Sequence, residues 1–199
     1  MKKFLHVGCG QLDKSHTTAG FNSDEWEETR YDIDESVRPD IIGTMTDMSS
    51  IETGSFEGLY SSHNIEHLPP HEVSVALYEF KRILKPDGIV VITCPDLVSI
   101  SALVAQDKLT DTAYISSAGP ITPLDMLYGH IDSLKRGHSH MAHRGGFTAK
   151  TLSEALTSAG FRTVATSTRA KHFDLWALAL PFVLDREEVE NLFRRYCQK

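Results

Sequence analysis

The chain has 199 residues and a formal net charge of −7 at pH 7, with 41% hydrophobic and 24% charged residues. This length allows one sizeable core, so a single domain over 1–199 is the starting expectation. The acidic balance offers no basic face for nucleic acid, and no apolar run approaches the roughly 20 residues that span a bilayer. Cys9, Cys94 and Cys197 are few and widely spaced, and no signal-peptide core follows Met1, so we expect a cytoplasmic protein without disulfides.

Seven short runs rich in β-branched and aromatic residues predict strands. In chain order they lie at 4–8, 29–34, 40–46, 57–62, 88–95, 161–169 and 173–181. Helical patterns fall between several of these runs. The alternation indicates an α/β fold built from βαβ units on a mostly parallel sheet.

Three segments carry apolar residues at the helical spacing i, i+3, i+4, i+7. The clearest spans 70–84 and is followed by a proline and a glycine that stop it. The second spans 149–159, with Gly160 placed to end it in a left-handed turn. The third begins near Asp185, which forms a capping-box pattern with Glu188. We expect all three helices to cover the sheet with their apolar stripes.

Between the fifth predicted strand and the second predicted helix, the segment 97–147 shows no clear period. A structureless loop of about fifty residues is uncommon in a compact domain, so we expect short helices there, packed as an insert or lid. His138 and His140 in this segment have no cysteine or patterned acid to complete a metal site, and we expect them to be solvated loop histidines.

Glycine or polar residues follow the first four predicted strands. In chain order these are Gly8 and Gly10, Asp32, Asp47, and Ser62 with His63. Open α/β sheets bind ligands outside the carboxyl ends of their strands, so these residues are expected to meet in one pocket. An acid about 20 residues beyond a glycine turn commonly accepts from ribose hydroxyls, which favours a nucleotide-type ligand.

Five segments together resemble class I S-adenosylmethionine-dependent methyltransferases of the small methyltransferase type 11 kind. They are LHVGCG at 5–10, YDID at 31–34, GTMTDM at 43–48, the stretch 55–97 with its EHL and LKPDG turns, and the stretch 143–161 that begins HRGGF. The resemblance implies a Rossmann-like, doubly wound sheet of seven strands, mostly parallel with the last strand antiparallel and helices on both faces. It also implies S-adenosylmethionine bound across the carboxyl ends of the strands.

The resemblance further implies which residues bind the cofactor. They are Gly8, Cys9, Gly10, Asp32, Ile33, Asp47, Met48, Ser62 and His63. The turn 8–10 would wrap the methionine portion with its backbone. Asp32 would take the ribose hydroxyls, and Ile33 would lie against the adenine.

The remaining implied contacts come from the third and fourth strand ends. Asp47 would accept from the adenine amino group with Met48 beside it, and Ser62 with His63 would line the sulfonium end. Leu12 stands where a dinucleotide fingerprint would place its next glycine. That departure fits the resemblance, because these enzymes place no pyrophosphate on the following helix.

The segment HNIEH, from His63 to His67, matches the HxxEH pattern of one class of zinc peptidases. That chemistry needs both histidines on one face of a continuous helix. Here the segment directly follows a predicted strand and is stopped by Pro69 and Pro70. We therefore expect no metal, with Glu66 and His67 hydrogen-bonded to the loop backbone; the alternative is a divalent ion held by His63, Glu66 and His67.

The expected reaction is methyl transfer from S-adenosylmethionine to a small-molecule acceptor by in-line displacement. Such a step depends mainly on holding the nucleophile ~3 Å from the methyl carbon. A general base is needed for a hydroxyl or a protonated amine, and the candidate catalytic residues are His63 first and His143 second. We expect neither nucleic acid nor membrane as partner, and the sequence leaves the acceptor and the oligomeric state open.

Two alternative functions share the predicted fold. An NAD(P)-dependent oxidoreductase is disfavoured because the next fingerprint glycine and a Tyr-x-x-x-Lys set are both missing. A non-catalytic cofactor-binding domain is disfavoured because the strand-end set Gly8, Gly10, Asp32 and Asp47 is complete.

Overall fold

A seven-stranded sheet runs through the molecule, which a computed structural model describes over residues 1–197. Across the sheet the order is β3 (Ile41–Ile42), β2 (Trp26–Asp32), β1 (Lys2–Val7), β4 (Phe56–Ser62), β5 (Leu84–Pro95), β9 (Asp174–Leu180) and β8 (Thr163–Arg169). The first five strands of this order pair in parallel, and β9 is antiparallel to both of its neighbours. The predicted Rossmann-like α/β sheet with an antiparallel last strand is confirmed. That strand is interior and buried along its whole length.

The predicted boundaries were wrong by three or more residues at three strands. The second was expected over 29–34, but β2 spans Trp26–Asp32. The third was expected over 40–46, but β3 holds only Ile41–Ile42, because Thr44 turns back to pair with Asp47. The fifth was expected from 88, but β5 begins at Leu84, which adopts an extended conformation directly after the first helix.

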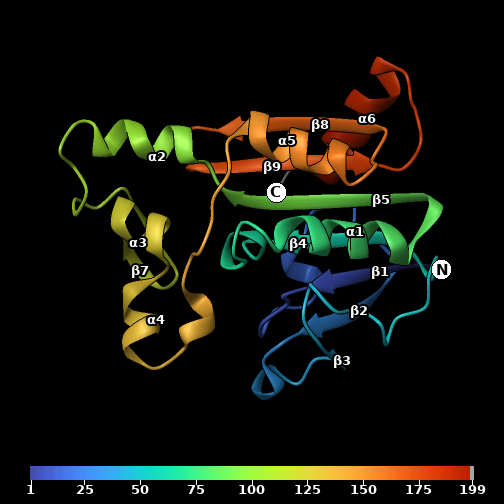
Figure 1. Cartoon of the computed structure of the whole chain (residues 1–199), viewed down its shortest axis with the longest axis horizontal. Helices are drawn as coiled ribbons and strands as arrows, with labels where there is room; N and C mark the ends of the chain where they lie inside the picture. Colours follow the sequence, from blue (N-terminus) through green and yellow to red (C-terminus); the bar gives the residue numbers. More distant parts are fainter. Residues whose placement is uncertain (198–199) are drawn as a thin grey trace.

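One face of the sheet is covered by α1 (Val73–Ile83) and α5 (Ala149–Ser158), which lie in front of the strands in Figure 1. The buried stripe of α1 is Val73, Ala76, Leu77, Phe80 and Ile83. Beyond α5, Gly160 has a φ of 93°, which is the left-handed end predicted for this helix. Both helices therefore pack through the apolar faces that their periodicity indicated.

The opposite face is covered by α6 (Arg186–Tyr196) and by the connection between β1 and β2. The capping box predicted at Asp185 and Glu188 is present. The connection from β1 to β2 contains only the 3-10 turn η1 (Lys14–His16) and no α-helix. Phe21 fills the place of a covering helix, packing its ring against Phe4 at 4.7 Å and against Tyr196 at 5.1 Å between centroids.

The segment predicted as an insert forms a separate layer of short elements. These are α2 (Leu97–Val104), the hairpin β6 (Tyr114–Ser116) and β7 (Gly119–Ile121), α3 (Pro123–Tyr128), α4 (Ile131–Lys135) and the 3-10 turn η4 (Ser139–Met141). They surround a small apolar cluster of Ile100, Ile121 and Met126. Figure 1 shows α3 and α4 beyond the arrowheads of β1 and β5, at the carboxyl edge of the sheet. Within 1–197 no helix combines the length and apolar character needed to cross a bilayer.

Candidate functional site

A cavity of about 750 Å³ opens at the carboxyl ends of β1, β2 and β4, and the insert lines its far side. Its lining includes 7–12, 31–34, 43–46, 62–64 and 67–69, together with Ser133, Arg136, His138, His140, Met141 and Arg144 from the insert. Open α/β sheets bind ligands at this edge, and the volume lies within the roughly 300–1,000 Å³ usual for small-molecule sites. The cavity is therefore the candidate functional site.

The glycine turn after β1 needs its two glycines for different reasons. Gly8 and Gly10 both have left-handed backbones, with φ of 62° and 54°. A Cβ on Gly8 would lie 1.8 Å from Oδ1 of Asn64, whose Nδ2 donates to the carbonyls of Val7 (2.9 Å) and Ser62 (3.0 Å). A Cβ on Gly10 would meet no atom within 4 Å. Gly8 thus lets the turn pack on β4, while Gly10 leaves backbone open to the cavity.

Asp32 fastens this glycine turn to the end of β2. Its Oδ2 accepts from the Gly10 amide (2.8 Å), and its Oδ1 accepts from the Asp34 amide (2.9 Å). Ile33 follows with a side chain that is 60% exposed. Cys9 is buried, and burial raises its pKa to about 11, so it stays a thiol near neutral pH. These predicted cofactor residues share one wall of the cavity.

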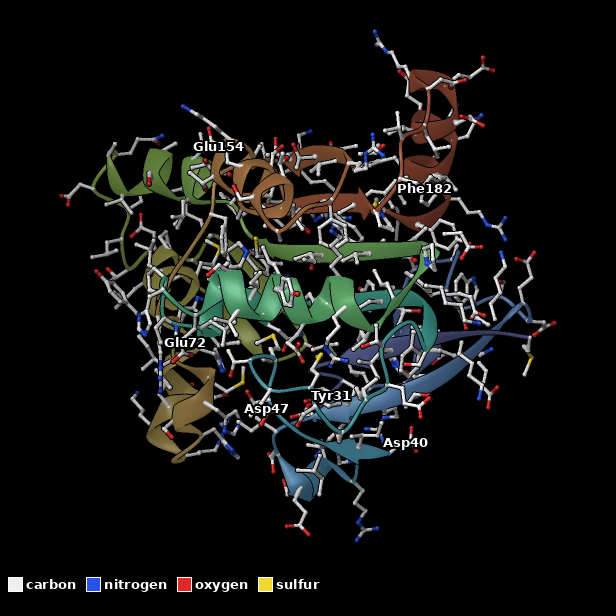
Figure 2. The ribbon with its side chains drawn as sticks, turned by 45° about the vertical axis from the view of Figure 1, so that its right-hand side comes forward. Tyr31, Asp40, Asp47, Glu72, Glu154 and Phe182 are labelled. Atoms are coloured by element: carbon white, nitrogen blue, oxygen red, sulfur yellow. The ribbon has the colours of Figure 1, made fainter. Side chains whose placement is uncertain are left out.

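Asp47 and Met48 are not among the residues that line the cavity. Met48 is fully buried in the core, whereas Asp47 is exposed and accepts from the Ser49 amide (3.1 Å). The preceding residues 43–46 line the cavity instead. Figure 2 shows Asp47 near Tyr31 below α1. The adenine contacts assigned to Asp47 and Met48 stay predictions.

This loop is fixed by side chains that sequence reasoning did not identify. The Tyr31 hydroxyl donates to the Thr44 carbonyl (2.8 Å), and burial raises its pKa to about 12. Arg82 of α1 donates to the Met48 carbonyl (2.8 Å) and to both carboxylate oxygens of Glu79 (2.7 and 2.8 Å). Glu79 in turn accepts from the Met48 amide (3.0 Å). The wall formed by 43–46 is thus held to β2 and α1.

Ser62 and His63 end β4 at the floor of the cavity. The Ser62 hydroxyl hydrogen-bonds that of Thr93 (2.9 Å), and the His63 amide donates to the Thr93 carbonyl (2.9 Å). His63 has a φ of 55°, an uncommon conformation for a non-glycine residue. Such strained positions cluster at functional sites. The half-exposed His63 ring places Nδ1 3.4 Å from Oε1 of Glu66.

Glu66 is a fully buried carboxylate beside three histidines. Burial by itself raises its pKa, but His63 above all, then His67 and His143, hold the pKa below the ordinary value. Neither carboxylate oxygen has a hydrogen-bond partner within residues 1–197. The Glu66 carbonyl, by contrast, accepts from the Arg144 amide at 2.8 Å. The prediction that the Glu66 carboxylate hydrogen-bonds the loop backbone was wrong, because only the main-chain carbonyl of Glu66 makes backbone hydrogen bonds.

His67 lies in the 3-10 turn η3 (Ile65–His67), and His143 lies where the insert returns. The ring nitrogens of His67 are each 3.1 Å from a carbonyl oxygen, those of Ala142 and His63, which confirms the backbone hydrogen bonds predicted for His67. His143 donates from Nδ1 to the Met126 carbonyl (2.8 Å), and burial lowers its pKa. Because η3 is a single turn, HNIEH lacks the continuous helix of a zinc peptidase.

The insert supplies cavity residues from the HRGGF segment and from the aperiodic part that precedes it. Arg144 lines the cavity and His143 does not, although both belong to the HRGGF segment that carried the resemblance. His138 and His140 are exposed, as predicted, and also lie at the cavity. Arg136 and Met141 gave no signal, because nothing in an aperiodic segment indicates which side chains face the sheet.

The glycine turn leads into η1, so no α-helix N-terminus stands between β1 and β2 to receive a pyrophosphate. Leu12 itself lines the cavity and is 48% exposed. This local structure lacks the helix on which dinucleotide binding depends. It argues against the NAD(P) alternative and agrees with a ligand that has no pyrophosphate.

Comparisons with known proteins point the same way. Residues 5–92 match a family model described as a methyltransferase domain, while no curated protein matches the chain in sequence. A SAM dependent methyltransferase from Archaeoglobus fulgidus is 15% identical, with a TM-score of 0.57 over 89% of this chain and 85% of its own. A SAM-dependent methyltransferase from Methanosarcina mazei is 14% identical, with a TM-score of 0.59 over 92% of this chain and 93% of its own.

A third solved structure of similar fold holds ligands. It is the 1,6-didemethyltoxoflavin-N1-methyltransferase of Burkholderia thailandensis, with 1,6-didemethyltoxoflavin and S-adenosylhomocysteine bound. Its identity is 16% and its TM-score 0.53, over 89% of this chain and 70% of its own. At these identities the three structures show a common fold. The methyltransferase-domain match over 5–92 contains the glycine turn, Asp32 and His63, so the chain combines this domain match with the fold seen in S-adenosylmethionine-dependent methyltransferases.

Proposed function

We propose that the chain transfers the methyl group of S-adenosylmethionine to a small-molecule acceptor by in-line displacement within the 750 Å³ cavity. The observation that carries the proposal is that one cavity has the glycine turn and Asp32 on one side and the insert on the other. An in-line step needs the nucleophile and the methyl carbon aligned in one enclosed space. The cofactor would occupy the strand-end side of the cavity, so the acceptor would bind against the insert.

In this proposal the cofactor lies along the wall of strand ends. The methionine portion runs over the turn at Gly10, whose exposed backbone leaves room for it. The ribose lies at Asp32, with the adenine between Ile33 and the loop 43–46. The sulfonium then faces His63, the residue at the floor of the cavity.

His63 is the proposed general base for an acceptor that must lose a proton. It lines the cavity, whereas His143 lies behind the wall with Nδ1 engaged by the Met126 carbonyl. The buried carboxylate of Glu66, 3.4 Å from Nδ1 of His63, stabilises the imidazolium that proton transfer would create. Histidine is suited to this role because an imidazole can accept and release a proton near neutral pH.

A small acceptor is supported by charge and by a protein of similar fold. The net charge of −7 gives no reason for binding a polyanion. The Burkholderia enzyme holds 1,6-didemethyltoxoflavin, a small molecule, together with S-adenosylhomocysteine.

Isothermal titration calorimetry tests the cofactor placement. Wild-type protein is titrated with S-adenosylmethionine, S-adenosylhomocysteine and NAD⁺, and the first two are expected to bind. Asp32→Asn keeps one acceptor oxygen and should weaken S-adenosylmethionine binding by about 10- to 100-fold, the loss of a charged hydrogen bond. Asp34→Asn is the matched control, because Asp34 accepts from the nearby Ser36 amide (2.9 Å), and it should change affinity less than about threefold. Binding of NAD⁺ alone, or a loss confined to Asp34→Asn, would contradict the proposal.

A further inference from the structure

The negative charge of the buried Glu66 carboxylate is not compensated by hydrogen bonds. Its side chain is 1% exposed, neither Oε1 nor Oε2 has a hydrogen-bond partner of normal geometry within 1–197, and the one ion-pair contact is with Nδ1 of His63, 3.4 Å from Oε1. Burying an ionised carboxylate is costly unless it is paired or coordinates a metal ion. A cation at this position would remove that cost.

Two histidine rings are oriented beside this carboxylate as metal ligands usually are. His143 donates from Nδ1 to the Met126 carbonyl (2.8 Å), which leaves Nε2 with a lone pair. His67 places Nδ1 against the Ala142 carbonyl (3.1 Å). A ligating histidine characteristically donates its second ring N–H to a backbone carbonyl, which fixes the tautomer and the ring plane.

Both ring nitrogens of His67 face carbonyl oxygens. Its Nε2 lies 3.1 Å from the His63 carbonyl, while its Nδ1 already faces a second carbonyl. A neutral imidazole has one N–H and can satisfy only one of these acceptors. A metal ion at Nε2 would replace this contact with the His63 carbonyl, and Glu66 would compensate the charge of the ion.

We propose that Glu66, His67 and His143 form a binding site for one divalent transition-metal ion, with Zn²⁺ as the best chemical match. One ligand atom from each residue lies within 4.8 Å of the other two. Two imidazoles and a carboxylate are ligands that Zn²⁺ accepts, at about 2.0–2.2 Å, and a tetrahedral ion would draw the three atoms to roughly 3.4 Å apart. The set differs from the HxxEH set, because His143 comes from the insert.

The position of the site gives the ion two consequences. It would join η3 to the returning insert, so that metal binding stabilises the closed cavity. His67 also lines the cavity, so an open coordination position could take an oxygen atom of the acceptor. This second consequence rests on the proposed function, whereas metal binding itself does not.

The test is metal binding by the full chain, with no methylation assay. Protein treated with chelator and dialysed is titrated with Zn²⁺ by calorimetry and with Co²⁺ by visible absorption. We expect one equivalent of either ion and the intense absorption bands of low-symmetry Co²⁺. Glu66→Gln and His143→Ala should each weaken binding by at least about tenfold, whereas exposed His140→Ala should not.

S-adenosylmethionine binding and circular dichroism report whether each variant is folded, and His143→Ala serves if Glu66→Gln is not. A thermal upshift with Zn²⁺ in the wild type that is absent in His143→Ala would support the site. Failure of the wild type to bind either ion, or equal binding by folded wild type and His143→Ala, would overturn it. Metal binding without cofactor binding would instead count against the proposed function alone.

Discussion

Gly8→Ala is the substitution whose effect follows most directly from the geometry of the cofactor turn. The left-handed backbone at Gly8, with a φ of 62°, costs an L-residue about 1–2 kcal/mol. The new Cβ would also lie 1.8 Å from Oδ1 of Asn64, and relieving such an overlap costs about 1–3 kcal/mol. The free energy of unfolding should therefore fall by about 2–5 kcal/mol.

Gly10→Ala is the matched control for this prediction. Gly10 has almost the same backbone, with a φ of 54°, but its Cβ would meet nothing within 4 Å. Only the backbone term of about 1–2 kcal/mol should appear in urea unfolding. For a given loss of stability, Gly10→Ala should weaken S-adenosylmethionine binding in calorimetry more than Gly8→Ala does. The reason is that the Gly10 methyl group projects into the proposed cofactor space while the protein stays folded.

A double-mutant cycle isolates the contact between Gly8 and Asn64. Asn64→Ala alone removes the donor that serves the Val7 and Ser62 carbonyls. In combination with Gly8→Ala it also removes the overlap, so the double variant should be more stable than the sum of the single losses by about 1–3 kcal/mol. Equal losses for Gly8→Ala and Gly10→Ala, with additive behaviour in the cycle, would refute the steric reasoning.

Two further predictions concern the loop 43–46. Tyr31→Phe removes the hydroxyl that donates to the Thr44 carbonyl (2.8 Å) and should cost about 1 kcal/mol in unfolding, together with a weaker S-adenosylmethionine affinity in calorimetry. Glu79 has a pKa held below its ordinary value of 4.5, first by the hydrogen bond from Arg82. Because the folded pKa is the lower one, this stabilisation is fully present above pH 4.5 and is lost as the pH falls through the folded pKa. When unfolding is measured from pH 6 to pH 3, the difference in free energy of unfolding between wild type and Glu79→Gln should become smaller as the pH falls. A difference that stays constant would exclude a stabilising contribution from ionised Glu79.

The parts of the fold that were predicted correctly are those in which local chemistry and tertiary packing agree. The helix α1 has an apolar stripe that remains buried from Val73 to Ile83, and α6 starts at its capping box. The boundary of β3 failed because a β-rich composition does not show where a chain turns, and Thr44 pairs back with Asp47. Phe21 could not be identified as a substitute for a covering helix, because its place depends on rings distant in sequence.

Candidate site residues divide in the same way. Gly8, Gly10 and Asp32 lie at strand ends, and parallel topology alone brings them together. Asn64 and Arg82 were missed because their roles are close approaches to main chain in another segment. An asparagine in a turn and an arginine near a helix end both have ordinary solvent-exposed explanations in sequence.

The burial of Glu66 connects the fold with the candidate site, because the insert docks over this residue. The Arg144 and Gly145 amides hold the Glu66 carbonyl at 2.8 and 3.0 Å, and the same returning segment supplies Arg144 to the cavity. Closing the acceptor side of the cavity therefore requires enclosing a carboxylate. The contact with His63, whose Nδ1 lies 3.4 Å from Oε1, offsets only part of the cost of burying this carboxylate, so a metal ion bound to Glu66 should favour the closed insert further. Cation binding at the Glu66 cluster and closure of the insert over the acceptor side of the cavity should therefore be thermodynamically coupled.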